Sequence, residues 1–121
     1  MRIEKAVIRQ MKLKFKTGFR TSFGTSVVKD FLLIGLYDKE GRLGLGECSA
    51  FMRPWYNEET TVGAKHVIGE FLIPALLKDE IESPEAFFDA TGWIRRNRMA
   101  RAAVDCALWD LWSRGSLPKN L

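Results

Sequence analysis

The sequence contains no run of about 18 apolar residues, so it does not predict a membrane-spanning helix. Its first ten residues, MRIEKAVIRQ, mix charged and apolar side chains and lack the apolar core of a secretory signal peptide. The only two cysteines, Cys48 and Cys106, lie far apart, which excludes a disulfide framework and a cysteine-based metal site. We therefore expect a reduced, cytoplasmic protein in which both cysteines are small buried side chains.

Residues suited to catalysis are also scarce. The single histidine, His66, has no Ser, Cys or carboxylate placed beside it, which favours a surface or structural role. The GLGEC segment at 44–48 is followed by neither Lys-Ser/Thr nor a helix start, so it is not a phosphate-binding loop. Asp105 and Asp110 are five residues apart on a predicted helix and do not share one face. This spacing excludes an acid/base pair and favours an anchoring role for Asp110.

What the sequence does contain is the composition of one folded domain. Its 121 residues are 46% hydrophobic and 28% charged, which is enough for a real core and argues against disorder. Period-two alternation and short apolar runs predict three strands, over residues 2–16, 31–38 and 42–48. Residues 17–29 are rich in Gly, Ser and Thr and predict a loop. Gly44 and Gly46 indicate that another element packs closely against the third strand.

The second half predicts about three helices. Asn57 is the expected N-cap of the first, and Pro74 is expected to end or kink it. Ser83, followed by Pro84, is a good start signal for the second. The third runs from Asn97 to Gly115 and carries a broad apolar stripe. The predicted fold class is therefore α+β, a three-stranded antiparallel β-meander followed by a bundle of about three helices.

One predicted loop has an unusually apolar composition. Residues 49–56 form a loop, yet Phe51, Met52, Trp55 and Tyr56 all lie within it. Loops are normally polar, and an apolar loop indicates a covering partner or a ligand.

The order of three motifs makes the sequence similar to a known family. These are TSFGT at 21–25, GECSAF with PWYNEET over 46–60, and MARAAVDCALWDLW at 99–112. Together they resemble the N-terminal capping domain of the enolase superfamily. Within its muconate-lactonizing subgroup they are most similar to o-succinylbenzoate synthase and N-acylamino-acid racemase. The resemblance covers about residues 1–114, and we expect a capping domain over 1–115 and a tail over 116–121.

The resemblance implies a role for the apolar loop. In that family two cap loops close over a substrate at the mouth of a (β/α)-barrel, and here they correspond to residues 18–26 and 49–56. The implied substrate-enclosing residues are Thr21, Ser22, Phe23, Gly24, Phe51, Met52, Trp55 and Tyr56. A lid that excludes water needs apolar side chains on a loop, which agrees with this reading. For Phe51 and Trp55, packing into the core of the cap itself is an equal alternative.

The family's chemistry resides in its barrel, where lysines move the α-proton and three carboxylates hold a magnesium ion. None of the 15 Asp and Glu residues of this sequence stands in such a context. We therefore expect no catalytic residue, no metal ligand and no cofactor in this chain, and magnesium only together with a barrel domain. The parent enzyme would be a magnesium-dependent lyase or racemase, whereas this chain alone is expected to be inactive. A truncated or frameshifted gene product, or a deliberately produced domain, would explain such a chain, and the substrate is undetermined.

The expected partners are a barrel domain or further copies of the chain, in contact through Phe23, Met52, Trp55 or Tyr56. An alternative is a small basic binding or assembly module, since the net charge is +4. Lys12, Lys14 and Lys16 alternate along the first strand, and Arg95, Arg96, Arg98 and Arg101 cluster later in the chain. No aromatic stacking residues interleave with the lysines, so a solvated strand face is favoured over nucleic-acid binding.

Overall fold

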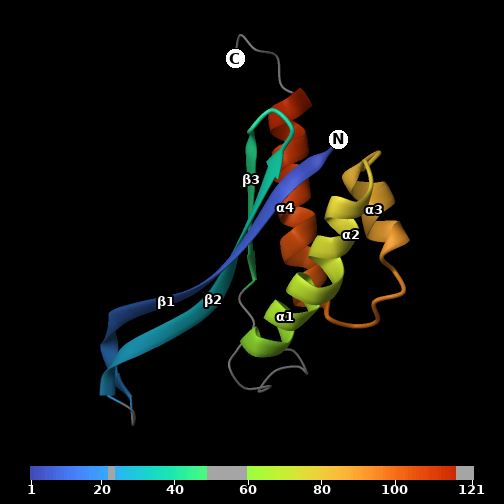
Figure 1. Ribbon diagram of the computed structural model, residues 1–121. Helices are drawn as coiled ribbons and strands as arrows, with labels where there is room; N and C mark the ends of the chain where they lie inside the picture. Colours follow the sequence, from blue (N-terminus) through green and yellow to red (C-terminus); the bar gives the residue numbers. More distant parts are fainter. Residues whose placement is uncertain (22–23, 49–59, 117–121) are drawn as a thin grey trace.

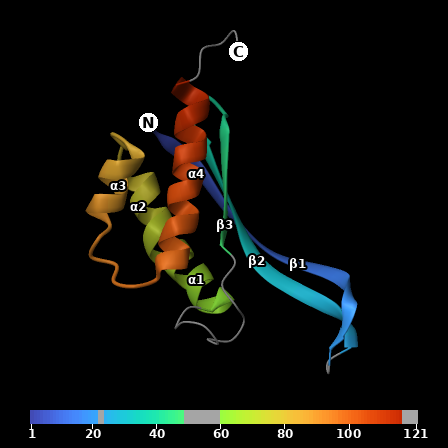
Figure 2. The same cartoon turned by 180° about the vertical axis from the view of Figure 1, so that it is seen from behind.

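The computed structural model describes the backbone of residues 1–21, 24–48 and 60–116 (Figure 1). The strands are β1 (Ile3–Thr21), β2 (Gly24–Asp38) and β3 (Leu43–Cys48). The helices are α1 (Thr61–Val67), the π-helical turn η1 (Ile68–Leu72), α2 (Ile73–Lys78), α3 (Pro84–Ala90) and α4 (Arg98–Ser116). The helices lie on one side of the sheet, and the β1–β2 hairpin extends well beyond them (Figures 1 and 2). The predicted α+β class is confirmed.

The sheet is a three-stranded antiparallel meander with strand order β1-β2-β3, as predicted. The loop predicted over residues 17–29 is wrong, because residues 17–21 and 24–29 are strand, and β1 and β2 end with Thr21 opposite Gly24. The Gly and Ser content of this segment predicts a loop, yet the segment also contains three threonines and two valines. Branched side chains of this kind favour extended backbone, and pairing between β1 and β2 stabilises that conformation further.

The core lies between the inner face of the sheet and the helices. β2 contributes Leu32, Ile34 and Leu36, each with no exposed surface. Of the apolar stripe predicted on the last helix, Met99 is partly buried, and five residues are buried against the sheet together with Ala100: Ala103, Val104, Ala107, Leu108 and Leu111. Ile68, Leu72 and Leu76 close the core from the η1–α2 side. None of the helices in the described part of the chain is long and apolar enough to span a membrane.

Gly44 sets how closely β3 and α4 approach. A Cβ built on Gly44 would stand 2.6 Å from the Cβ of Leu111 and 2.8 Å from its backbone nitrogen. No side chain fits there, so the helix lies directly on the strand backbone. The element expected to pack against the third strand is therefore α4, and the small residues of α4 meet glycines of a strand.

The first helical segment begins later than predicted. Its N-cap is Thr60, whose Oγ1 accepts the backbone N–H of Gly63 at 3.1 Å, while Asn57 lies outside the described residues. The chain also stays helical through Pro74. In the π-helical turn before it, the N–H of Ile73 donates to the carbonyl of Ile68, five residues back. This wider turn accommodates a proline that lacks an N–H and would clash with a carbonyl in a regular α-helix.

The starts of the other two helices agree with the sequence. The Oγ of Ser83 accepts the N–H of Ala86 at 3.0 Å, and Pro84 occupies the first turn of α3. At the start of α4, the carbonyl of Asn97 accepts the N–H of Arg101 at 3.0 Å. Arg96 and Asn97 reach this start through left-handed backbone, with φ of 57° and 49°. This turn redirects the chain from α3 into α4.

Candidate functional site

The roots of the two predicted substrate loops lie at the same end of the molecule. The tip of the β1–β2 hairpin, the end of β3 and the start of α1 all point downward in Figure 1, and again in the reverse view of Figure 2. The β2–β3 turn and the end of α4 lie at the opposite end. The described residues from which both loops start therefore lie at one end of the domain, an arrangement that a lid requires.

Most of the predicted site residues themselves fall outside the described residues. Thr21 and Gly24 are the last paired residues of the β1–β2 hairpin. Ser22 and Phe23 stand between them in the sequence and are outside the described part. The other four, Phe51, Met52, Trp55 and Tyr56, are outside it as well. The substrate-enclosing role of all eight residues stays a prediction.

The residues on either side of the second loop are firmly held. Cys48 ends β3 and is 1% exposed. On the other side, Thr60 caps α1, while Thr61 and Ala64 are each 1% exposed. Both ends of the 49–59 segment are thus fixed in the core, which is how a scaffold positions a functional loop.

At the opposite end, Asp38 locks the β2–β3 turn. Its Oδ1 accepts the backbone N–H of Glu40 and of Arg42, each at 2.9 Å, and its Oδ2 accepts the Arg42 Nε at 2.7 Å. Burial opposes ionisation of this carboxyl, but the hydrogen bonds outweigh it and hold the pKa of Asp38 below its ordinary value. Gly41 completes the turn with a φ of 81°. The hydrogen bonds of Asp38 thus hold the β2–β3 turn in place.

Asp110 joins α4 to the free edge of β3. Its Oδ2 accepts the backbone N–H of Leu45 at 2.8 Å, and its Oδ1 lies 3.5 Å from the Arg114 guanidinium. The expected anchoring role of Asp110 is confirmed. The bond also satisfies an N–H that would otherwise be open to a further strand.

The other titratable candidates do not form an active centre. His66 is exposed, as expected, and its ring meets the edge of Phe71 with centroids 5.8 Å apart. Burial raises the pKa of Asp105, and Arg101 and a hydrogen bond from Trp109 partly offset this. Within residues 1–21, 24–48 and 60–116 no three His, Cys, Asp or Glu side chains gather as metal ligands would.

The expectation for the two cysteines is half right. Cys48 is buried, whereas Cys106 is exposed on α4. The apolar stripe of that helix runs through Ala103, Val104 and Ala107, and Cys106 lies beside it on the solvent side. A small side chain is compatible with either place, so residue type alone did not determine its burial.

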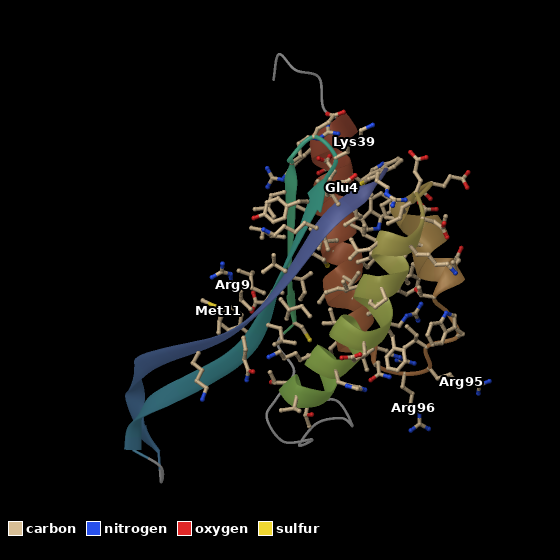
Figure 3. The ribbon with its side chains drawn as sticks, viewed as in Figure 1. Glu4, Arg9, Met11, Lys39, Arg95 and Arg96 are labelled. Carbon is tan, nitrogen blue, oxygen red and sulfur yellow. The ribbon has the colours of Figure 1, made fainter. Side chains whose placement is uncertain are left out.

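The described basic side chains do not form one continuous surface. Arg9 lies on β1, while Arg95 and Arg96 lie at the far lower side beyond the helices (Figure 3). A backbone-binding surface for nucleic acid needs a continuous basic stripe, so this arrangement does not favour the basic-module alternative.

Comparison with known proteins identifies the family to which this chain is similar. A family model described as "Mandelate racemase / muconate lactonizing enzyme, N-terminal domain" matches residues 3–117. The chain is 39% identical over 112 residues to an o-succinylbenzoate synthase of Geobacillus stearothermophilus, covering 93% of this chain and 30% of that protein. It is 40% identical over 114 residues to an N-succinylamino acid racemase of Thermus thermophilus, covering 94% and 31%. The chain thus spans about 30% of the length of these relatives.

Solved structures agree with the fold. A crystal structure of an enolase-superfamily member from Listeria innocua superposes with a TM-score of 0.84 at 39% identity, covering 95% of this chain and 31% of that one. A second one, from Enterococcus faecalis, gives a TM-score of 0.79 at 36% identity, covering 95% and 31%. Each match is confined to under a third of a longer protein.

Proposed function

Because this chain belongs to the family of mandelate racemase / muconate lactonizing enzyme N-terminal domains, we propose that it is a capping domain that encloses a substrate for a catalytic barrel. The observation that carries the proposal is the common position of the two loop roots. The β1–β2 hairpin and the segment after β3 leave the domain at one end, and a cap needs its contacts there (Figures 1 and 2).

In this proposal the described residues hold the ends of the loop that closes over the substrate. A loop that closes over a substrate works when its two ends are fixed, since a misplacement of about 1 Å costs much of the rate. Cys48 and Thr61, which are both buried, fix the ends of the second loop. The apolar side chains between them would exclude water from the reacting centre.

Proton transfer and magnesium binding belong to the catalytic barrel in this proposal. Magnesium prefers an octahedral set of oxygen ligands, with one or more protein carboxylates. The described residues do not fit such a site, because no three potential ligands gather among them. We therefore assign no metal-dependent step to this chain.

The names of the relatives suggest a class of substrate. Both o-succinylbenzoate and an N-succinylamino acid carry a succinyl group. We propose that the substrate enclosed by this cap carries one too, and that Phe51, Met52, Trp55 and Tyr56 lie against its apolar part.

A domain exchange tests the proposal. Residues 1–116 of this chain would replace the matching N-terminal portion of the Geobacillus stearothermophilus o-succinylbenzoate synthase. Formation of o-succinylbenzoate and racemisation of an N-succinylamino acid would then be measured. A functional cap should keep kcat/KM within about tenfold of the parent enzyme, a loss below about 1.4 kcal/mol of transition-state stabilisation.

A matched pair of variants distinguishes a role in enclosing the substrate from an effect on folding alone. In the exchanged enzyme, Trp55→Ser removes a predicted lid side chain, whereas Trp93→Ser removes an exposed indole on the helical side. We expect the first to lower kcat/KM and the second to leave it unchanged. A folded exchange protein without turnover, or one that is insensitive to Trp55→Ser and to Phe51→Ser alike, would contradict the proposed role.

A further inference from the structure

The solvent side of α4 carries a second apolar stripe. We call it the outer stripe of α4, and it consists of Ala102, Cys106 and Trp109. The three residues follow one another at helical spacing and are all exposed, Trp109 to 41%. In Figure 2 this helix lies in the foreground, and no other helix or strand of the described chain crosses in front of it.

Charged residues border the outer stripe on both sides, but they are engaged with neighbouring elements. On one side, the guanidinium of Arg101 lies over the Phe88 ring of α3, 4.0 Å from the centroid, and donates to the Phe88 carbonyl at 2.8 Å. On the other side, Asp110 accepts the N–H of Leu45 in β3. A helix that packs on a core normally presents polar side chains to water. Here the middle of the solvent side is apolar, which is typical of an interaction surface.

A notch lies between the outer stripe and α3. It has a volume of about 190 Å³ and is lined by two aromatic side chains and three carboxylates, namely Phe88, Trp109, Glu85, Asp89 and Asp105. Asp105 accepts a hydrogen bond from Trp109 and is close enough to Arg101 to be stabilised by its charge. Glu85 and Asp89 are exposed. With one guanidinium against three carboxylates, the notch carries net negative charge.

Such a notch fits a basic side chain from a partner. An aromatic ring attracts a cation, and a carboxylate beside it supplies the opposite charge. The chain already uses this chemistry internally, since Arg101 lies over Phe88 with Asp105 nearby. A metal ion is a poor alternative, because the part of the chain that the structure describes holds no group of three metal-ligating side chains.

We propose that the outer stripe of α4 is the surface on which the catalytic barrel docks, and that a lysine or arginine of the barrel enters the notch between α3 and α4. This inference rests on the proposed function, because it takes the barrel as the partner. Apolar contact along the stripe supplies the driving force for docking, and the charge pair in the notch fixes its register.

The place of α4 in the chain identifies the barrel as the occupant. The family model describes an N-terminal domain and its match ends at residue 117, directly after α4. The Geobacillus stearothermophilus relative is covered over only 30% of its length, so its larger part follows this helix. A domain joined at that point is held next to the stripe at high effective concentration.

The direction of α4 supports the same partner. The helix begins near the end of the domain where the two loops start and ends at the opposite one (Figures 1 and 2). A barrel that is joined after α4 and also lies under the loops therefore has to extend along the helix. The outer stripe is the exposed apolar surface on that path.

The thiol of Cys106 reports on this contact directly. Its rate of reaction with a small maleimide would be measured in the 121-residue chain and in the exchanged enzyme described above, with mass spectrometry to assign each modified cysteine. We expect the rate to be at least about 100-fold lower in the exchanged enzyme. Cys48, which is 1% exposed, should react slowly in both. A cysteine introduced as Lys78→Cys, at an exposed position of α2, should react rapidly in both.

Two changes in the notch test the basic side chain of the barrel. In the exchanged enzyme, Asp89→Lys adds a like charge and Trp109→Ser removes an aromatic wall, and each should raise the rate at Cys106 at least about tenfold. A lysine near the C-terminal end of α3 suits the helix dipole, so Asp89→Lys should leave the cap folded. Glu70→Lys and Trp93→Ser make the same chemical changes at exposed positions outside the notch and should have no effect.

The outcomes separate this inference from the proposed function. A Cys106 that reacts in the exchanged enzyme as fast as in the free chain overturns the docking surface, even if the enzyme is active. A protected Cys106 in an inactive enzyme would support the docking surface and contradict the capping function. Protection that is insensitive to Asp89→Lys and to Trp109→Ser alike would overturn the inserted basic side chain. Protection in the free chain that grows with concentration would place a second copy on the stripe and overturn the proposal.

Discussion

Gly46 of β3 lies directly beneath the backbone carbonyl of Ala103 in α4, closer than any side chain allows. A Cβ on Gly46 would also stand 3.0 Å from the backbone nitrogen of Ala107. Because both neighbours are helix backbone, neither can rotate away. We expect Gly46→Ala to push α4 off the sheet and to destabilise the domain by at least about 2 kcal/mol, measured as a loss in the free energy of unfolding in urea.

Gly69→Ala is the matched control for this change. A Cβ on Gly69 would meet only Ile8 Cδ1, at 3.7 Å, which is ordinary van der Waals contact. Since Gly69 lies in a helical turn, alanine there should be neutral or stabilising by up to about 1 kcal/mol. An equal loss in both variants would show that the close approach of β3 and α4 is not what Gly46 provides.

Asp38 should make the stability of the domain depend on pH in the acid range. Its pKa is held below the ordinary value of 3.8 by the hydrogen bonds from Arg42 and Glu40, against the opposing effect of burial. A lowered pKa stabilises the folded state above about pH 4, and this stabilisation is lost as pH falls through the folded pKa. The variant Asp38→Asn keeps an oxygen acceptor but cannot ionise, so it isolates this contribution.

The measurement is urea unfolding of the native chain and of Asp38→Asn between about pH 2 and pH 7. The difference in unfolding free energy should be constant above about pH 5 and should shrink as Asp38 becomes protonated at lower pH. A difference that stays constant down to pH 2 would mean that the carboxylate charge does not matter to the turn.

Ser83 should stabilise α3 through its cap. Its Oγ accepts the N–H of Ala86 at 3.0 Å, and replacement by alanine leaves that N–H without a protein partner. We expect Ser83→Ala to cost about 1 kcal/mol of unfolding free energy. Ser113→Ala offers the same chemical change on the exposed side of α4, where alanine is the better helix former and the cost should be near zero. Equal effects at both positions would argue against the cap.

Much of this fold was predictable because its signals are local. Ser83 and Pro84 mark a helix start by their own chemistry, and the alternation of residues 2–16 needs no partner to be recognised. Where the outcome depended on a distant contact, the prediction was wrong. The segment 17–29 became strand because the two arms pair with each other. At Pro74, where an end or a kink was predicted, the adjustment is local: a π-helical turn, through which the chain stays helical.

The candidate site was predictable only through its family resemblance. The aromatic content of residues 49–56 predicts that something covers that loop, but not what covers it. The alignment of Arg9, Leu33 and Glu47 across the three strands was missed for a different reason. Arg9, Leu33 and Glu47 form one row only through the register of three strands, and register is set by pairing across the sheet.

Asp110 should protect the edge of β3 in a way that can be observed at a single amide. Its carboxylate accepts the Leu45 N–H at 2.8 Å. In Asp110→Ala this amide is open to water, and its hydrogen exchange should accelerate by at least about tenfold, with about 1 kcal/mol lost in stability. Asp110→Asn keeps an acceptor and should lie between the two. Unchanged exchange at Leu45 in Asp110→Ala would mean that the bond is not formed in solution.

The final prediction concerns the chemistry of the isolated chain. A racemase or dehydration mechanism of this family needs a base within reach of an α-proton and a metal that neutralises the resulting oxygens. Of the described basic side chains, Lys5 lies over the Tyr37 ring, with its Nζ 5.5 Å from the centroid, and Lys12 is exposed on β1, so neither stands in a closed site. We expect the purified 121-residue chain to bind magnesium no more tightly than millimolar in calorimetry. We also expect it not to exchange the α-proton of an N-succinylamino acid in deuterated water. Saturable micromolar magnesium binding together with α-proton exchange would show that catalytic groups reside in this domain and would refute its role as a cap alone.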